Sequence, residues 1–194
     1  MAIAKQPEPA PLLTYEAYIA EGEICKRYDI LDGVRMDMPN PTRRHQDIAG
    51  NIYEALRAYQ RASGRGRTFF APCDVLIRYE PLRIRQPDVL FISYEQLAKC
   101  SDNTNPAPLF AAPELVVEIL SPSETPRMRE GKLQDYCQVG VQECWMVSQD
   151  TETVEVLRFT KAGAETVEVY AQNQTLRSIV FPELTIAVAA IFAL

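Results

Sequence analysis

The spacing of apolar residues changes from segment to segment along this chain, and it predicts helices and strands in alternation. Residues 115–120 are apolar at every position but one, which is typical of a central strand covered on both faces. Residues 89–92 form a second apolar run of the same kind. Four apolar residues recur at helical spacing and predict a long amphipathic helix over residues 42–62: Ile48, Ile52, Leu56 and Tyr59.

Turn and cap residues mark the ends of further elements. Asp32-Gly33 joins two alternating segments, which predicts a β-hairpin over residues 27–38. Thr125-Pro126 has the form of a helix start and Gly140 that of a helix stop. Shorter patterns predict helices at 15–21 and 94–98, strands at 68–71, 73–78, 142–148, 153–160 and 165–170, and a strand or short helix within 181–194.

These elements predict an α/β fold: a mixed β-sheet flanked by helices, with extra antiparallel strands. Residues 1–12 are Pro-rich and are expected to form a loose tail, and residues 13–194 a single domain. A Pro/Asn-rich loop that ends at Ala112 is long for a compact domain, which favours a role in function or in partner binding.

Composition and charge exclude several classes of protein. The net charge of -6 excludes a basic nucleic-acid coat. Five cysteines without a Cys-x-x-Cys motif fit neither a disulfide framework nor a zinc cluster, so we expect reduced thiols and a cytoplasmic location. Residues 185–194 are apolar but too short to cross a bilayer, and we expect no membrane association.

The positive charge is concentrated in one part of the sequence. Residues 41–85 hold nine arginines against four acids, whereas the sequence from residue 86 onward is acidic. Such a basic region fits either a solvated helix face or a contact with a polyanion. The candidate nucleic-acid-binding residues are Arg57, Arg61, Arg65 and Arg67.

Two carboxylates stand at the ends of the buried strands. Asp88 precedes the apolar run 89–92, and Glu118 lies near the end of the run 115–120. Either one fits a structural role as well, Asp88 as a turn residue and Glu118 as the partner of an arginine. If the two strands are antiparallel neighbours, however, the carboxylates converge. With the Ile119 carbonyl and water they would then hold a hard divalent cation.

Lys132 lies on the helix that follows, on the same face as Arg129 and Tyr136. This face fits either a solvated basic surface or a group that orients water and stabilises phosphate oxygens beside a metal. His45, the only histidine, falls in the first turn of the long helix. That position favours a solvated residue over a catalytic base.

The motifs in order resemble the Uma-type family of endonucleases within the PD-(D/E)XK nuclease superfamily. The resemblance runs from Thr14 onward. It is carried by Tyr28–Gly33, His45, Gln86–Val89, Leu115–Ser123, Lys132 with Tyr136, and Gly140–Trp145.

This resemblance implies a restriction-endonuclease-like core and cleavage of phosphodiester bonds that depends on Mg²⁺ or Mn²⁺. It maps the metal ligands onto Asp88 and Glu118. The superfamily lysine usually stands two residues after the acid, where this chain has Leu120, and the family resemblance assigns it to Lys132 instead. An assisting N-terminal acid maps onto Asp29, where the family more often has Glu.

The chain departs from the family pattern at two further positions. Met128 stands where the family commonly has an acid four residues before the lysine, and Ser148 where it usually has Asp. Loss of the acid removes a helical partner of Lys132. Both departures predict reduced turnover rather than a different fold.

The sequence therefore predicts a metal-dependent DNA endonuclease that forms a homodimer through its sheet edges or the long loop. A catalytically weakened relative that binds nucleic acid or a protein partner is the first alternative. A carboxylate–metal hydrolase of small phosphoesters is the second, and the lack of a further His or Asp cluster disfavours it.

Overall fold

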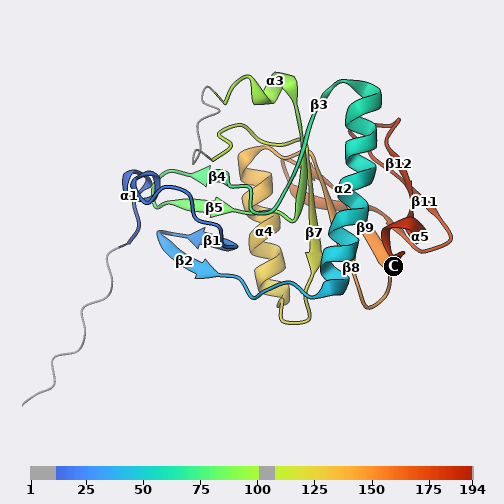
Figure 1. Ribbon diagram of the computed structural model, residues 1–194, viewed down its shortest axis with the longest axis horizontal. Helices are drawn as coiled ribbons and strands as arrows, with labels where there is room; N and C mark the ends of the chain where they lie inside the picture. Colours follow the sequence, from blue (N-terminus) through green and yellow to red (C-terminus); the bar gives the residue numbers. More distant parts are fainter. Residues whose placement is uncertain (1–11, 101–107, 194) are drawn as a thin grey trace, which may run out of the picture.

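The computed structural model describes residues 12–100 and 108–193. The predicted N-terminal tail, apart from residue 12, and most of the predicted Pro/Asn-rich loop lie outside these residues. The described part is a mixed α/β structure, as predicted, in which helices flank a mixed sheet and further antiparallel strands lie beside it (Figure 1).

The main sheet has six strands in the order β10-β9-β8-β7-β6-β3. Only β7 and β8 run parallel, while all other neighbours are antiparallel. The two central strands β7 and β8 are buried, and β10 is an exposed edge strand. The strands are β3 (Gly66–Phe70), β6 (Val89–Ser93), β7 (Leu115–Leu120), β8 (Glu143–Ser148), β9 (Thr153–Thr160) and β10 (Gly163–Tyr170).

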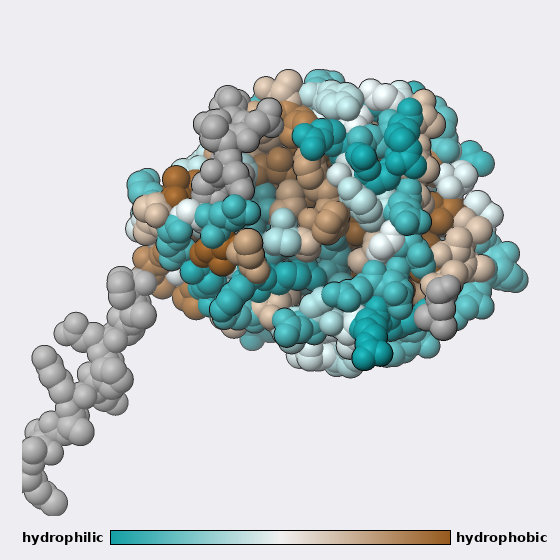
Figure 2. Space-filling model, viewed as in Figure 1, coloured by the Kyte–Doolittle hydropathy of each residue, from teal (hydrophilic) through white to brown (hydrophobic). Residues whose placement is uncertain are grey.

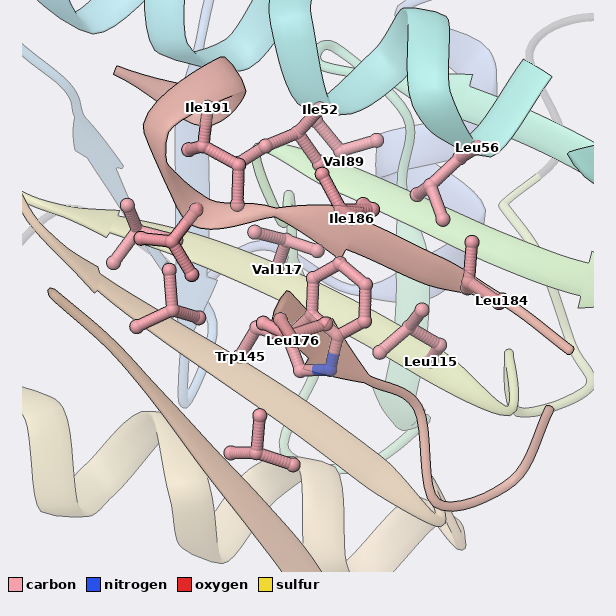
Figure 3. Packing of buried hydrophobic residues seen from close by; sticks show 14 of the residues in the cluster. Ile52, Leu56, Val89, Leu115, Val117, Trp145, Leu176, Leu184, Ile186 and Ile191 are labelled. Atoms are coloured by element: carbon pink, nitrogen blue, oxygen red, sulfur yellow. The ribbon is translucent and has the colours of Figure 1, made fainter. Parts of the chain in front are cut away.

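Two helices cover opposite faces of this sheet. Helix α2 (Arg43–Ser63) packs on one face through the four apolar residues that predicted it, and α4 (Pro126–Val139) packs on the other. Figure 3 shows Ile52 and Leu56 of α2 pointing toward Val117 and Trp145 in the sheet. Strands β11 (Thr175–Arg177) and β12 (Thr185–Ala187) and helix α5 (Val188–Ile191) complete the α2 face.

A second sheet of four antiparallel strands lies beside α4, in the order β2-β1-β5-β4. It has its own apolar cluster, to which the first helix contributes Tyr18. The elements are α1 (Tyr15–Ala20), β1 (Tyr28–Leu31), β2 (Val34–Asp37), β4 (Val75–Arg78) and β5 (Arg83–Arg85), and α3 (Tyr94–Leu97) follows β6.

The predicted turn and cap residues have the backbone conformations that their roles require. Asp32 and Gly33 both have positive φ, the geometry of a two-residue hairpin turn. Thr42 and Thr125 cap α2 and α4 by accepting backbone N–H groups of the first turn. Gly140 ends α4 in the left-handed region, with φ of 96°.

Two strands were not predicted. Strand β5 has only three residues, two of them arginines, and it forms because β1 and β4 offer backbone partners on either side. Strand β11 is also three residues long and pairs only with β12. Neither segment contains enough residues to show a period, so pairing partners distant in the sequence decide both.

All five cysteines are free thiols, as predicted. Within residues 12–100 and 108–193, no helix combines the length and the apolar character needed to cross a membrane.

Candidate active site

Strands β6 and β7 are antiparallel neighbours, and this pairing brings Asp88 and Glu118 together. Val89 pairs with Val117, so the residue before Val89 lies beside Glu118. The Oδ2 atom of Asp88 accepts a hydrogen bond of 2.7 Å from the Ile119 amide of the neighbouring strand. Both carboxylates are almost fully buried, with 4% and 3% of the residue exposed.

Asp88 receives its compensating charge from two elements outside the main sheet. Arg27, which precedes β1, places its Nη1 atom 2.6 Å from Oδ1 of Asp88, and Nε2 of His45 in α2 lies 3.4 Å from the same oxygen. Burial alone would raise the pKa of Asp88, but His45, Arg27 and the Ile119 amide together hold that pKa below its ordinary value.

The prediction that His45 is a solvated residue is wrong. Its side chain is only 12% exposed and lies against Asp88. The reason is the direction of α2, whose N-terminal turn ends beside the start of β6. Sequence position in a first turn does not indicate which neighbour that turn meets. Arg27 was missed altogether, because a residue just before a hairpin strand has no sequence signal that links it to Asp88.

Glu118 is compensated from α4. Its Oε2 atom is 2.7 Å from Nζ of Lys132, and its Oε1 atom accepts a short hydrogen bond from the Tyr136 hydroxyl. Burial is the largest influence on Glu118 and raises its pKa, and the nearby Asp88 raises it further, against the effect of Lys132. The predicted face of α4 with Lys132 and Tyr136 is therefore turned toward Glu118 and is not a solvated surface.

A second carboxylate, Glu124, also holds Lys132. Its Oε1 atom lies 2.9 Å from Nζ of Lys132, but no donor is aligned with this oxygen, so the contact is an ion pair without a directed hydrogen bond. Burial opposes the positive charge, yet Glu118 and Glu124 outweigh it and raise the pKa of Lys132. Met128, where an acid was expected, is 54% exposed, and Glu124 from the preceding turn supplies the missing negative charge.

Asp29 contacts Arg85 and Gln86, the residues that lead into Asp88. Its Oδ2 atom pairs with Arg85 at 2.5 Å and its Oδ1 atom accepts from the Gln86 amide at 3.3 Å. Arg85 also contacts Asp135 of α4 at 2.6 Å. These contacts hold the segment that leads into Asp88, and both carboxylate oxygens of Asp29 are engaged in them.

The four candidate nucleic-acid-binding arginines lie at the far end of α2 and the start of β3. Arg61, Arg65 and Arg67 are exposed and Arg57 is half-buried. Arg65 faces Glu183 at 3.5 Å, and the guanidinium of Arg67 lies 4.7 Å from the ring centre of Phe69. At the helical rise per residue, Arg61 is roughly 24 Å along α2 from His45. The structure does not bring these arginines to the carboxylates.

The donor set at Asp88 and Glu118 fits a hard cation that keeps much of its water. Mg²⁺ is commonly held by one or two carboxylates together with substrate phosphate and water. Oδ1 of Asp88 faces both Arg27 and His45, whereas Oδ2 of Asp88 and the two oxygens of Glu118 each accept from one protein donor and retain a second lone pair. Within the described residues, no group of three or more His, Cys, Asp or Glu side chains forms a metal cluster. The fit is therefore to a two-carboxylate site.

Comparisons with known proteins identify the fold and the family of this chain. A crystal structure of a putative nuclease belonging to DUF820 from Anabaena variabilis is similar, with a TM-score of 0.74 and 18% sequence identity. The match covers 93% of this chain and 97% of that one, and at this identity it shows the fold alone. No curated protein matches this chain. The model of the Uma2 family, described as "Putative restriction endonuclease", matches residues 15–189, so the chain belongs to that family.

Proposed function

We propose that this chain is a divalent-metal-dependent endonuclease that hydrolyses phosphodiester bonds in DNA. The observation that carries the proposal is the meeting of Asp88 and Glu118 at adjacent strand ends with Lys132 against Glu118. Membership of a family of restriction-endonuclease type supports it.

In this proposal Asp88, Glu118 and the Ile119 carbonyl hold Mg²⁺ or Mn²⁺. When bound, such an ion neutralises charge on the phosphodiester and lowers the pKa of a water molecule. The ammonium of Lys132 stays protonated because two carboxylates flank it, so it serves as a positive donor to phosphate oxygens and not as a base. Glu124 and Glu118 fix the direction of Lys132, and Arg27 and His45 fix that of Asp88.

A second candidate is a relative that binds nucleic acid without cutting it. The observation in its favour is that Arg27, His45, Lys132 and Tyr136 already occupy the carboxylate oxygens. A metal ion would have to share these oxygens with protein donors. Binding and cleavage must therefore be measured separately.

The first prediction concerns the metal. Calorimetry should detect Mn²⁺ binding to the natural protein, and Asp88→Ala or Glu118→Ala should abolish it, because each removes one of two carboxylate ligands. Asp47→Ala, an exposed acid on α2, is the matched control and should leave binding unchanged. Unchanged binding in both site variants would sink the assignment of the ligands.

The second prediction concerns cleavage. Lys132→Ala should slow plasmid nicking by ~10²–10³, the scale for loss of one electrostatic stabiliser. Metal affinity should hold or rise, since a nearby positive charge has been removed. Glu124→Gln should slow nicking less, because Glu118 still contacts Lys132, and Lys99→Ala is the control. Equal nicking by the natural protein and Lys132→Ala would exclude the assigned role. Metal binding without nicking by the natural protein would favour the second candidate.

The third prediction concerns the charge that Lys132 compensates in the metal-free protein. Lys132→Met leaves Glu118 buried without its cation and should cost about 3 kcal/mol of unfolding free energy at neutral pH. The pKa of Glu118 is already above its ordinary value of 4.5 and should rise further. A raised carboxyl pKa favours the fold at low pH, and that stability is lost as the pH rises through the folded-state pKa. The deficit should therefore shrink on acidification.

Urea unfolding at acidic and at neutral pH measures this deficit. Lys99→Met, whose side chain is 56% exposed, is the control and should change stability by less than about 0.5 kcal/mol. A deficit that does not depend on pH would show that Lys132 does not compensate a titrating carboxylate.

The fourth prediction concerns the arginines. Replacing Arg57, Arg61, Arg65 and Arg67 by Ala should lower the slope of log affinity against log salt by about 3, if each contacts a phosphate. Arg158 of β9 and Lys161 in the β9–β10 turn, both exposed, provide a control pair of cations. If the quadruple variant keeps the slope of the natural protein, these arginines form only a solvated face.

A further inference from the structure

A pocket of about 400 Å³ opens beside Asp88, between the first half of α2 and the end of β3. Figure 2 shows apolar side chains gathered between the polar surface of α2 and the four-stranded sheet on this face of the molecule. Three polar groups of the candidate active site line the pocket: Arg27, His45 and Asp88. Glu118 and Lys132 do not line it. Of the two candidate metal-binding carboxylates, the pocket therefore reaches Asp88, from the side of α2.

Small residues keep this pocket wide. Ala49 and Gly50 of α2 and Ala71 after β3 line it. A Cβ atom built at Gly50 would meet nothing within 4 Å, so a side chain at this position would enter open space. Glycine within a helix is less favourable than alanine, and α2 nevertheless carries it where the helix faces the pocket.

The remaining wall is aromatic. Phe70, the last residue of β3, is 57% exposed, although it is a large apolar side chain. The ring of Tyr53 in α2 packs edge-to-face with the ring of Phe70, with ring centres 4.8 Å apart and an interplanar angle of 78°. Gln46 adds an exposed amide at the rim, a group that can both donate and accept hydrogen bonds. Aromatic rings, an amide and two basic side chains thus meet around one cavity.

We propose that this pocket receives an unpaired nucleobase of the nucleotide next to the scissile phosphate, so that the substrate is single-stranded or locally unpaired DNA. This inference rests on the proposed nuclease function. Aromatic side chains bind bases of any sequence by stacking, and an amide can contact a base edge. Arg27 and His45, which line the pocket beside Asp88, suit the adjoining phosphate as hydrogen-bond donors. In a continuous duplex, a base must first leave its stack and its pair before it can enter a side pocket, whereas an unpaired base avoids most of that cost.

The charge and size of the pocket agree with this occupant. A volume of about 400 Å³ falls in the range of small-molecule sites, and it suits a base with its sugar. A purely apolar ligand would suit the pocket poorly, because the polar groups of Arg27, His45 and Asp88 on its lining would lose water without gaining a hydrogen-bond partner. A nucleotide supplies both the aromatic ring and the anion.

The test compares binding of a short oligothymidine with binding of an abasic oligomer of equal length, which keeps the phosphates and lacks the bases. Fluorescence anisotropy in Ca²⁺ measures both without cleavage. The natural protein should bind the oligothymidine about 5- to 150-fold more tightly, the range for stacking of one base. Phe70→Ala should lose this preference by removing the platform, and Gly50→Leu by filling the cavity.

Two control variants separate the pocket from general effects. Tyr94→Ala removes a ring that is 50% exposed at the opposite end of β6, and Gly50→Ala adds only a methyl group to α2. Both should keep the preference for bases. Preference retained in Phe70→Ala and Gly50→Leu would overturn the inference, as would equal binding of the two oligomers by the natural protein.

The outcomes distinguish this inference from the proposed function. If the protein prefers bases through Phe70 but does not cleave DNA, the endonuclease proposal is wrong and the base-pocket proposal stands. If it nicks DNA without any preference for bases, the base-pocket proposal is wrong and the endonuclease proposal stands. A protein that binds neither oligomer and no duplex overturns both.

Discussion

Two buried carboxylates at the ends of neighbouring strands are the constraint on which the rest of this structure depends. A buried charge without a partner is strongly destabilising, so Asp88 and Glu118 need cations or donors from elsewhere. Arg27 comes from the hairpin side, His45 from α2, and Lys132 with Tyr136 from α4. Compensation of two side chains thus ties three separate elements to the centre of the main sheet.

A second buried network extends this frame. Arg85 of β5 bridges Asp29 of β1 and Asp135 of α4, and Arg83 contacts Asp135 at 2.6 Å. Removing one member would leave the opposite charges buried without a partner. The network therefore joins the four-stranded sheet to α4, and it orients the Gln86-Pro87-Asp88 segment relative to Lys132.

The charge compensation of Asp88 and Glu118 also affects how strongly the site can bind a metal ion. Cations beside Asp88 and Glu118 stabilise the protein without a metal, and they weaken the attraction of these carboxylates for one. A substrate phosphate would change that balance, since Arg27 and Lys132 could then turn from carboxylate to phosphate. In the proposed endonuclease, the metal would then bind together with the substrate.

The local elements of the fold could be predicted from the sequence because their signals are short in range. Apolar spacing defined α2, Asp32-Gly33 defined the hairpin, and Thr125 with Gly140 defined the ends of α4. The two buried apolar runs indicated strands. Asp88 and Glu118 became candidate site residues because they are charged and lie at the ends of these runs. Each of these signals involves residues only a few positions apart. The periods of helices and strands and the geometry of turns relate such residues directly, so the sequence reveals them.

The tertiary structure alone decided which side chains complete the site. Arg27 lies 61 positions from Asp88 in the sequence, and their contact depends on how the four-stranded sheet is set against the main one. His45 turned from an expected surface residue into a neighbour of Asp88, and Glu124 took the place of the acid missing at Met128. Strand β5 and the pocket lined by Gly50 and Phe70 likewise have no local signal. Contacts between segments distant in sequence follow from packing, and a single sequence carries no period or spacing that records them.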